Sequence, residues 1–482
     1  MTKPTINTLG ALKAAGYGYK SLKTELKENL IQHIKEDRDP FPGILGYDKT
    51  VRPQIERAVL AGHNILLLGL RGQAKTRFAR LMINLMDDYI PYLTGSELNE
   101  DPFHPLTEKS RKLIETQGDD TEISWLSREQ RLVEKLATPD VSVADLIGDI
   151  DPIKAANLKL SFSDEGVIHY GLIPRANRSI FIINELPDLQ PRIQVSLFNI
   201  LQEQDIQIRG FNLRIPLDVQ FVFTANPEDY TNRGNIITPL KDRIESQIIT
   251  HYPESIDTGK SITRQEAKIS DEIERKIHVP EMARDLMEVI TMVARKSEYI
   301  DQASGVSARL PITAMEQLMA SAERRLLIDN SDHTTIRVMD FLHTLPAMTG
   351  KLELVYEGEQ LGAEAVSRNL IETAIESLSR SVFPNPSKYE EADQDPYGTI
   401  RAFFSDHSAF IMDAAMVDEE YQDMLDSVAG LEELTVKFFP HKKEDKYFFM
   451  ELALHALCGY DILQRSMSIE EIKFEDPLQG LF

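Results

Sequence analysis

NILLLGLRGQAKTRFARLM, residues 64–82, is the stretch that decides the fold. It begins with a short apolar run, which is typical of a strand buried on both faces. A loop containing two glycines follows, and the residues after the loop have the apolar spacing of a helix. The order strand, loop, helix indicates an α/β fold whose loop is placed to bind phosphate groups.

The loop itself meets the phosphate-binding pattern G-x-x-x-x-G-K-[ST], except that Ala74 stands where the second glycine is expected. Backbone N–H groups in such a loop turn toward the phosphates. Lys75 is expected to reach the β- and γ-phosphates, and the Thr76 hydroxyl to ligate Mg²⁺. The alternative is a strand-to-helix turn with a chance Lys-Thr pair. The residues predicted to hold ATP are Gly69, Leu70, Arg71, Gly72, Gln73, Ala74, Lys75, Thr76 and Arg77.

A second apolar run, SIFIIN from Ser179, ends in Asn184 and Glu185. A nucleotide site of this kind usually has Asp-Glu here, where Asp binds a water on Mg²⁺ and Glu polarises the attacking water. Asn184 accepts a hydrogen bond from a metal-bound water but brings no charge, so we expect weaker Mg²⁺ binding. Glu185 keeps the role of general base. A buried strand with a polar end is the simpler interpretation of this segment alone.

A third apolar run, VQFVFTA from Val219, delivers Asn226 at its end. Between the two earlier strand ends, this side chain would orient the lytic water or touch the γ-phosphate. By itself, an Asn before Pro is more often a turn that ends a strand.

Two further β-rich runs, RLVEKLA from Arg131 and ESQIIT from Glu245, belong to the same region. The five runs alternate with helical patterns over residues 41–252, which predicts a mostly parallel sheet flanked by helices. Residues 1–40 resemble a helical leader. Insertions are expected at about 91–130, with structure of its own, and at 158–171, where alternating residues fit a β-hairpin. The chain after residue 252 is predominantly helical in pattern.

The order of GLRGQAKT, FIINE, FTANPED, PLKDR and GVSARLP resembles AAA+ ATPases of the MoxR and magnesium-chelatase I-subunit group. Members commonly have Ala at the position of Ala74. The resemblance covers about Phe41–Gly350. It implies an α/β AAA+ P-loop core with a parallel five-stranded sheet of order 5-1-4-3-2, and a helical lid at 253–350. Residues 351–482 lie outside it and are expected to form an extra, mostly helical C-terminal domain.

The resemblance also implies roles for four arginines and one glycine. Arg243 matches the arginine finger that acts on ATP in the neighbouring subunit, with a helix-end salt bridge beside Asp242 as the alternative. Arg309 matches the sensor-2 arginine of the lid, with an exposed arginine at a helix start as the alternative. Arg175 and Arg178, in PRANR, fall near the subunit interface of the family, where a structural role is equally plausible. Gly46, in ILGYD, falls where the family holds adenine.

These assignments imply an ATP-hydrolysing motor that uses ATP and Mg²⁺ and works as a homo-oligomeric ring, expected to be a hexamer. Such a ring would remodel or activate a partner protein, and a von Willebrand A domain protein is a candidate partner. One alternative is the motor subunit of a chelatase that inserts Mg²⁺ into a porphyrin. The acidic C-terminal domain and Asn184 make it the weaker choice. A second alternative is a scaffold that binds ATP without turnover.

Composition limits the partners. The formal net charge is −24, so binding to nucleic acid through phosphates is disfavoured. No apolar run approaches the roughly 18 residues that span a bilayer. Cys458 is the only cysteine, so an intramolecular disulfide is impossible. The N-terminal residues lack the pattern of a signal peptide, and a cytoplasmic protein is expected.

Overall fold

The structure is a computed structural model that describes residues 3–159, 165–208, 214–226, 235–389, 395–406, 409–440 and 443–477. The chain divides into two compact units, Met1–His251 and Tyr252–Phe482, and each is described by itself. Among the residues that the structure describes, no helix has both the length and the apolar composition that a membrane span requires.

The first unit is built around a five-stranded sheet of the order β11-β1-β10-β7-β4, in which every neighbouring pair is parallel. Numbered along the chain, these strands have the order 5-1-4-3-2, which confirms the predicted α/β fold and its strand order. The strands are β1 (Ile65–Leu68), β4 (Leu132–Leu136), β7 (Ser179–Asn184), β10 (Val219–Ala225) and β11 (Ser246–Ile249).

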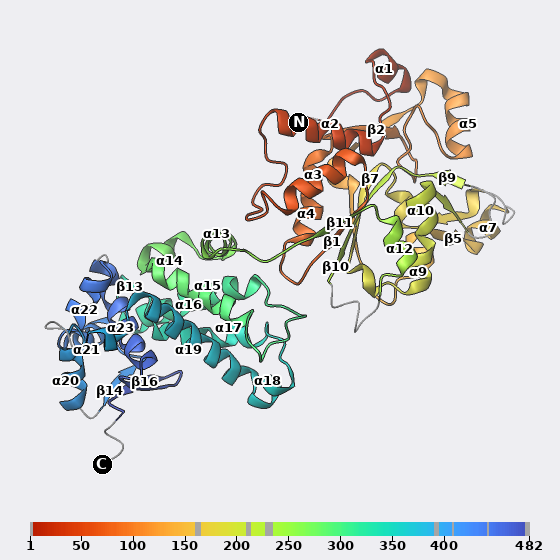
Figure 1. Ribbon diagram of the computed structural model, residues 1–482. Coiled ribbons are helices and arrows are strands. Elements are labelled where there is room, and N and C mark those ends of the chain that lie inside the picture. The colour runs from red at the N-terminus through yellow and green to blue at the C-terminus, as the bar shows by residue number, and fades with distance from the viewer. Residues whose placement is uncertain are drawn as a thin grey trace. The chain divides into compact units, whose positions relative to one another are not determined.

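Helices cover both faces of this sheet (Figure 1). Successive side chains of a strand point to opposite faces. Ile65 and Leu67 of β1 therefore belong to one buried cluster, with α2, α3 and α4, while Leu66 belongs to the other, with α9, α10 and α12. The described helices of this unit are α1 (Leu9–Ala14), α2 (Leu22–Lys35), α3 (Val51–Ala61), α4 (Lys75–Leu81), α5 (Glu108–Gln117), α6 (Val143–Leu146), α7 (Pro152–Leu158), α8 (Leu172–Arg175), α9 (Pro191–Ser196), α10 (Phe198–Glu203) and α12 (Thr238–Arg243).

The register of the strands brings their carboxyl ends to one edge of the sheet. Leu68, the last residue of β1, is paired with Ala225, the last residue of β10. On the other side of β10, Phe223 is paired with Ile183 of β7. The residues that follow these strands therefore converge at the edge where open parallel sheets bind ligands.

Short antiparallel pairs lie outside the central sheet. In the segment predicted as the first insertion, β2 (Tyr89–Leu93) pairs with β3 (Ile123–Ser127). The other pairs of this unit are β5 (Gly148–Ile150) with β6 (Ile168–Tyr170), and β8 (Asp205–Gln207) with β9 (Arg214–Pro216). Single 3-10 turns are η1 (Met82–Leu85), η2 (Gly118–Asp120), η3 (Arg128–Arg131), η4 (Glu165–Val167) and η5 (Leu186–Asp188).

The hairpin predicted within residues 158–171 falls in part on residues 160–164, which lie outside the described residues. Of the described part, Glu165–Val167 forms a 3-10 turn. The strand Ile168–Tyr170 pairs instead with Gly148–Ile150, which precedes the segment. A side chain at Gly148, whose φ is +119°, would lie 2.3 Å from the His169 carbonyl oxygen, so this glycine permits the close pairing.

The second unit is mainly helical and has one continuous buried core. The longest helices, α16 and α19, pack with α15 and α23 around it. Its described helices are α13 (Ile256–Glu266), α14 (Asp271–Lys276), α15 (Glu281–Ala294), α16 (Arg309–Asp329), α17 (Leu345–Thr349), α18 (Tyr356–Leu361), α19 (Ala363–Val382), α20 (Gly398–Asp406), α21 (Asp418–Asp426), α22 (Leu431–Phe438) and α23 (Lys446–Gly459), with 3-10 turns η6 (Met339–Thr344), η7 (Pro386–Lys388) and η8 (Lys443–Asp445).

Two small sheets complete the second unit. β12 (Ile277–His278) pairs in parallel with β13 (Thr334–Thr335). An antiparallel sheet of order β14-β16-β15 lies near the end of the chain, in the domain that the sequence predicts to be mostly helical. Its strands are β14 (Phe410–Asp413), β15 (Gln464–Met467) and β16 (Glu471–Glu475).

Candidate nucleotide-binding site

The loop between β1 and α4 contains two residues in the left-handed backbone region. Gly72 has φ +73° and Ala74 has φ +56°. The left-handed region is free for glycine and costs an alanine on the order of 1 kcal/mol. Ala74 therefore adopts the backbone conformation that a glycine would favour, and its presence does not change the path of the loop. Arg71 and Arg77 are exposed on either side of this turn.

The start of the loop is held by tight packing at Gly69. A Cβ atom at this position would lie 1.9 Å from Thr250 Oγ1 and 2.2 Å from Gln73 Oε1. The Thr250 hydroxyl also donates to Gln73 Oε1 at 2.7 Å. Because Thr250 follows β11, this hydrogen bond fastens the loop to the neighbouring strand. A glycine is required here by space.

The segment ILGYD, which contains Gly46, contacts the loop through its tyrosine. The Tyr47 hydroxyl lies 3.1 Å from the Gln73 carbonyl oxygen and 2.6 Å from the His251 carbonyl oxygen. Its ring packs edge-on against His251. Gly46 has φ +80°, a turn conformation that favours glycine. Tyr47, next to the predicted adenine position, therefore lies beside the loop.

The Lys75 ammonium is buried, with 7% of the residue exposed. It donates hydrogen bonds to the backbone oxygens of Gly69 and Leu70 and to Asn226 Oδ1, the last at 2.7 Å. A buried ammonium needs such acceptors because leaving water is costly for a charge. These contacts hold the positive charge at the ends of β1 and β10.

Asn226 connects Lys75 with Glu185. Its amide nitrogen donates to Glu185 Oε2 at 3.2 Å. Glu185 has φ +55°, so the chain turns sharply after β7, and its backbone N–H donates to Thr224 Oγ1 at 3.3 Å. The structure thus brings together Lys75, the first residue of α4, with Asn226 and Glu185, which directly follow β10 and β7.

The other polar cluster of the edge contains the residues predicted for Mg²⁺. The hydroxyl of Thr76 donates to Asn184 Oδ1 at 3.1 Å, and Thr224 does the same at 3.1 Å. Hydroxyl and amide oxygens are hard donors of the kind that Mg²⁺ prefers, directly or through water. The donor set therefore fits a Mg²⁺ ion held by Thr76 and, through water, by Asn184.

Two residues of this cluster were missed by sequence reasoning. Glu134 Oε1 accepts a hydrogen bond of 2.6 Å from the Asn184 amide nitrogen. Arg80 of α4 donates to both oxygens of Glu134, at 2.7 and 2.8 Å. These hydrogen bonds, from Arg80 first, hold the pKa of the Glu134 carboxyl below its usual value. Side chains alternate between the two faces of a sheet along β4, which places Glu134 on the same face as Asn184. This alternation is the only sequence feature that could have predicted Glu134 as part of the site.

Three of the arginines assigned by resemblance have different surroundings. Arg243 ends α12, stacks 4.7 Å from the centre of the Phe198 ring and donates to Gln202 Oε1 at 3.1 Å. Arg178 is 4% exposed and forms an ion pair of 3.1 Å with Asp101, which gives it a structural role inside the first unit. Arg309 is the first residue of α16, in the second unit.

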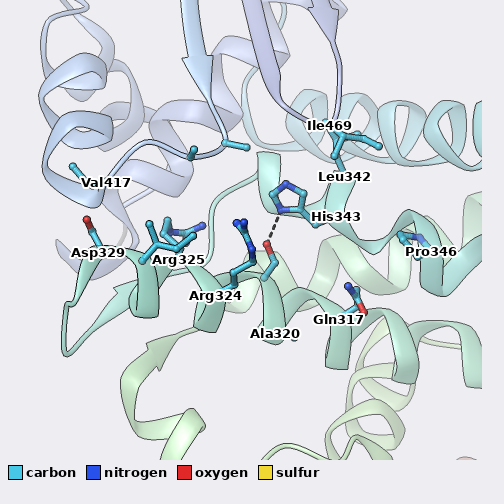
Figure 2. Close-up of a pocket in the computed structure, with 14 residues that line it drawn as sticks. Gln317, Ala320, Arg324, Arg325, Asp329, Leu342, His343, Pro346, Val417 and Ile469 are labelled. Atoms are coloured by element: carbon cyan, nitrogen blue, oxygen red, sulfur yellow. Dashed lines mark hydrogen bonds between the residues drawn. The ribbon is translucent and has the colours of Figure 1, made fainter.

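A separate pocket lies in the second unit (Figure 2). It is a cavity of about 490 Å³ between α16, η6 and the segments around Val417 and Ile469. His343 hydrogen-bonds through Nδ1 to the Ser321 hydroxyl at 2.6 Å. Its walls are mainly apolar, and it contains none of the residues of the β1–α4 loop. The candidate site therefore rests on the loop and strand ends of the first unit.

The family model of the Sigma-54 interaction domain matches residues 158–249, which include β7, β10 and β11. No curated protein sequence matches the chain significantly. The five-stranded parallel sheet and this match define an AAA+ domain, the fold class that carries the site.

Three solved structures that resemble the chain are distant from it. A complex of the magnesium chelatase subunits BchI and BchD contains a chain of 17% identity and TM-score 0.34, covering 67% of this chain and 98% of that one. A RuvB mutant of Thermotoga maritima has 12% identity and TM-score 0.36, covering 91% and 96%. NtrX of Brucella abortus in complex with ATP has 15% identity and TM-score 0.35, covering 60% and 52%. Similarity at this level assigns no activity to the chain.

Proposed function

We propose that this chain is an ATP-hydrolysing motor of the AAA+ class, which assembles into a ring and remodels or activates a partner protein. The observation that carries the proposal is the connected series Lys75, Asn226, Glu185 at the ends of three parallel strands. A cation, an amide and a carboxylate at this edge are the groups that phosphoryl transfer to water requires.

In the proposed reaction, Lys75 and the loop amides bind the β- and γ-phosphates of ATP. The Lys75 ammonium would exchange its backbone acceptors for phosphate oxygens, a stronger, charge-assisted contact. Asn226 orients the attacking water between itself and Glu185, and Glu185 accepts the proton of that water. Thr76 and Asn184 would hold Mg²⁺, which supplies neutralisation of the triphosphate charge when it is bound.

Arg243 is proposed to complete the site of the adjoining subunit, because an arginine at the phosphates stabilises charge that develops during transfer. Hydrolysis would then depend on assembly, which is the reason for proposing a ring, with a hexamer as the expected size. Arg309 is proposed to report the state of the γ-phosphate to the helical lid. The partner proposed from the resemblance is a von Willebrand A domain protein.

A second candidate function is a scaffold that binds ATP without turnover. Asn184 is the observation that favours it, since the position usually filled by Asp carries no charge here. The remaining groups of the site are all present, and we therefore prefer an active ATPase.

Phosphate release from the purified chain with ATP and Mg²⁺ tests the proposal. Hydrolysis that is lost in both Glu185→Gln and Lys75→Ala, while Glu185→Gln still binds ATP, supports it. Binding without hydrolysis in the native chain would establish the scaffold instead, and absence of ATP binding would reject both. Light scattering of Glu185→Gln with ATP gives the ring size. The same variant immobilised with ATP, with Lys75→Ala as the control, captures a partner that binds only the nucleotide-loaded ring.

A further inference from the structure

Glu134 lies beside the carboxyl end of β7, although it belongs to β4. In the parallel register of these strands, Glu134 is paired with Ile182, and Leu136 with Asn184. Glu134 and Asn184 are therefore diagonal neighbours on one face of the sheet, within reach of a long side chain. The observed distance of 2.6 Å between Glu134 Oε1 and Asn184 Nδ2 is a short hydrogen bond to a carboxylate.

This contact fixes the orientation of the Asn184 amide. A carboxylate accepts hydrogen bonds and does not donate them, so Asn184 must direct its NH₂ group toward Glu134. Its oxygen then points the other way, where it accepts from the Thr76 and Thr224 hydroxyls. Without Glu134, the Asn184 side-chain amide could rotate by 180°, so that its oxygen and its NH₂ group exchange places.

Arg80 connects the same carboxylate to the loop helix. It lies four residues after Thr76, on the same face of α4, and its guanidinium binds both oxygens of Glu134. Glu134 is thus held from one side by α4 and itself holds Asn184 on the other. Asn184 carries no negative charge, but the Glu134 carboxylate on the neighbouring strand β4 does, and Arg80 balances that charge.

We propose that Glu134 is a positioning residue that turns the Asn184 oxygen toward Thr76, and that Asn184 and Glu134 act as a matched pair. The proposal deepens the function proposed above and rests on it for the Mg²⁺ role. It also explains why Asn stands where related sites have Asp. An aspartate at 184 would place a second carboxylate against Glu134, and adjacent carboxylates disfavour each other's charge.

Unfolding of the chain without nucleotide or Mg²⁺ tests the pair independently of catalysis. Trp125, the single tryptophan, lies in the first unit and reports its melting by fluorescence. We expect Asn184→Asp to lower Tm by about 2–4 °C or more, and Asn184→Asp combined with Glu134→Gln to recover it, since the glutamine amide can donate to the new carboxylate. Glu364→Gln, in the exposed ion pair with Arg368, is the control and should leave this transition unchanged.

Mg²⁺-dependent binding of a fluorescent ATP analogue tests the positioning role. Glu134→Ala should raise the Mg²⁺ concentration for half-maximal binding by about 10-fold, the usual effect of removing a group that orients a metal ligand. Glu134→Gln should raise it less, because its carbonyl oxygen still accepts from Asn184.

The outcomes separate the two proposals. An Asn184→Asp variant that melts no lower than the native chain would overturn the matched pair while ATP hydrolysis by the native chain still stands. An unchanged Mg²⁺ requirement in Glu134→Ala would reject the positioning role. If the native chain shows no Mg²⁺-dependent binding, the proposed function fails and the Mg²⁺ role of Glu134 fails with it, whereas the melting data still decide whether Asn184 and Glu134 are matched.

Discussion

The side chains of Lys75 and Asn226, 151 residues apart in the sequence, are joined by a hydrogen bond of 2.7 Å. This contact links the loop after β1 to the end of β10, and Asn226 extends it to Glu185. The parallel register of the sheet therefore assembles the site. Each side chain of the site can be substituted singly while the strands stay in place.

Lys75→Ala should weaken ATP binding strongly with little loss of fold. The variant loses the charge-assisted contacts to phosphate, so we expect the Kd for ATP to rise by about 100-fold or more, each factor of ten corresponding to about 1.4 kcal/mol. Calorimetric titration with ATP measures this. Lys27→Ala, on the exposed face of α2, is the control for loss of one positive charge. An unchanged Kd in Lys75→Ala would exclude the loop as the nucleotide site.

Gly69→Ala should damage the loop by steric conflict. The new Cβ meets the Thr250 hydroxyl and the Gln73 amide oxygen, and overpacking of this kind destabilises by about 1–3 kcal/mol. Urea unfolding followed through Trp125 measures the change, and ATP binding should weaken in the same variant. Gly18→Ala is the matched control, because its Cβ would have no atom within 4 Å. Equal stability of the two variants would show that the loop relaxes freely.

Much of this site could be predicted from sequence because its members follow apolar runs. Residues 64–76 gave strand, loop and helix in one segment, and Asn184 and Asn226 each follow a run that forms a fully buried strand. Parallel strands with helical crossovers then bring their ends to one edge. The strand order itself came from the resemblance, since apolar runs do not specify their neighbours.

The remaining features depend on contacts between segments that carry no local signal. In the sequence, Glu134 has the pattern of an ordinary exposed strand residue. Only the register of β4 and β7 shows that it is a diagonal neighbour of Asn184. Alternation at residues 158–171 predicted a strand correctly at Ile168–Tyr170 but not its partner, because β5 lies outside that segment. The buried pair of Glu25 and Arg131 joins residues 106 apart, and neither position shows a pattern that predicts burial of a charge.

Glu25→Ala should strongly destabilise the first unit. Glu25 of α2 binds the Arg131 guanidinium through both oxygens, at 2.7 and 2.6 Å, and the two side chains are 3% and 0% exposed. Removing one partner of a buried ion pair leaves an uncompensated charge and costs about 3–5 kcal/mol. Urea unfolding followed by fluorescence tests this. Glu28→Ala, which removes an exposed carboxylate from the same helix, should change the unfolding free energy by less than about 0.5 kcal/mol. Similar losses in both variants would contradict the prediction.

Glu288→Gln should change how the stability of the second unit depends on pH. Burial raises the pKa of the Glu288 carboxyl, against the opposing hydrogen bond from Thr263. The folded state therefore keeps this proton at pH values where the unfolded state has released it, and stability falls as pH rises between the two pKa values. Glu288→Gln lacks this decline with pH. The free energy of unfolding of the variant, minus that of the native chain, should therefore increase from pH 4 to pH 8. In native Glu281 the hydrogen bond from Lys260 lowers the carboxyl pKa, so stability rises with pH only below the ordinary glutamate pKa. Glu281→Gln should therefore show the opposite trend in chemical denaturation at acidic pH and no trend between pH 6 and pH 8.

Arg243→Ala should leave ATP binding intact and remove hydrolysis, because the arginine is proposed to act on the adjoining subunit. Loss of an arginine finger lowers turnover by about 1,000-fold or more. Lys241→Ala, on the same helix α12, controls for the loss of a positive charge and should hydrolyse ATP normally. Phosphate release and ATP titration together separate the loss of turnover from the loss of binding.

Mixing Arg243→Ala with Glu185→Gln distinguishes action between subunits from action within one. Each variant alone is inactive, but a mixed ring contains interfaces where an intact Glu185 of one subunit faces an intact Arg243 of its neighbour. With random assembly through a head-to-tail interface, about one site in four is complete, and activity should approach that fraction of the native rate. A mixture that stays inactive, although light scattering shows that the subunits co-assemble, would place the action of Arg243 within its own subunit. In that case Arg243 would act only on the site of its own subunit, so another residue would have to couple hydrolysis to assembly.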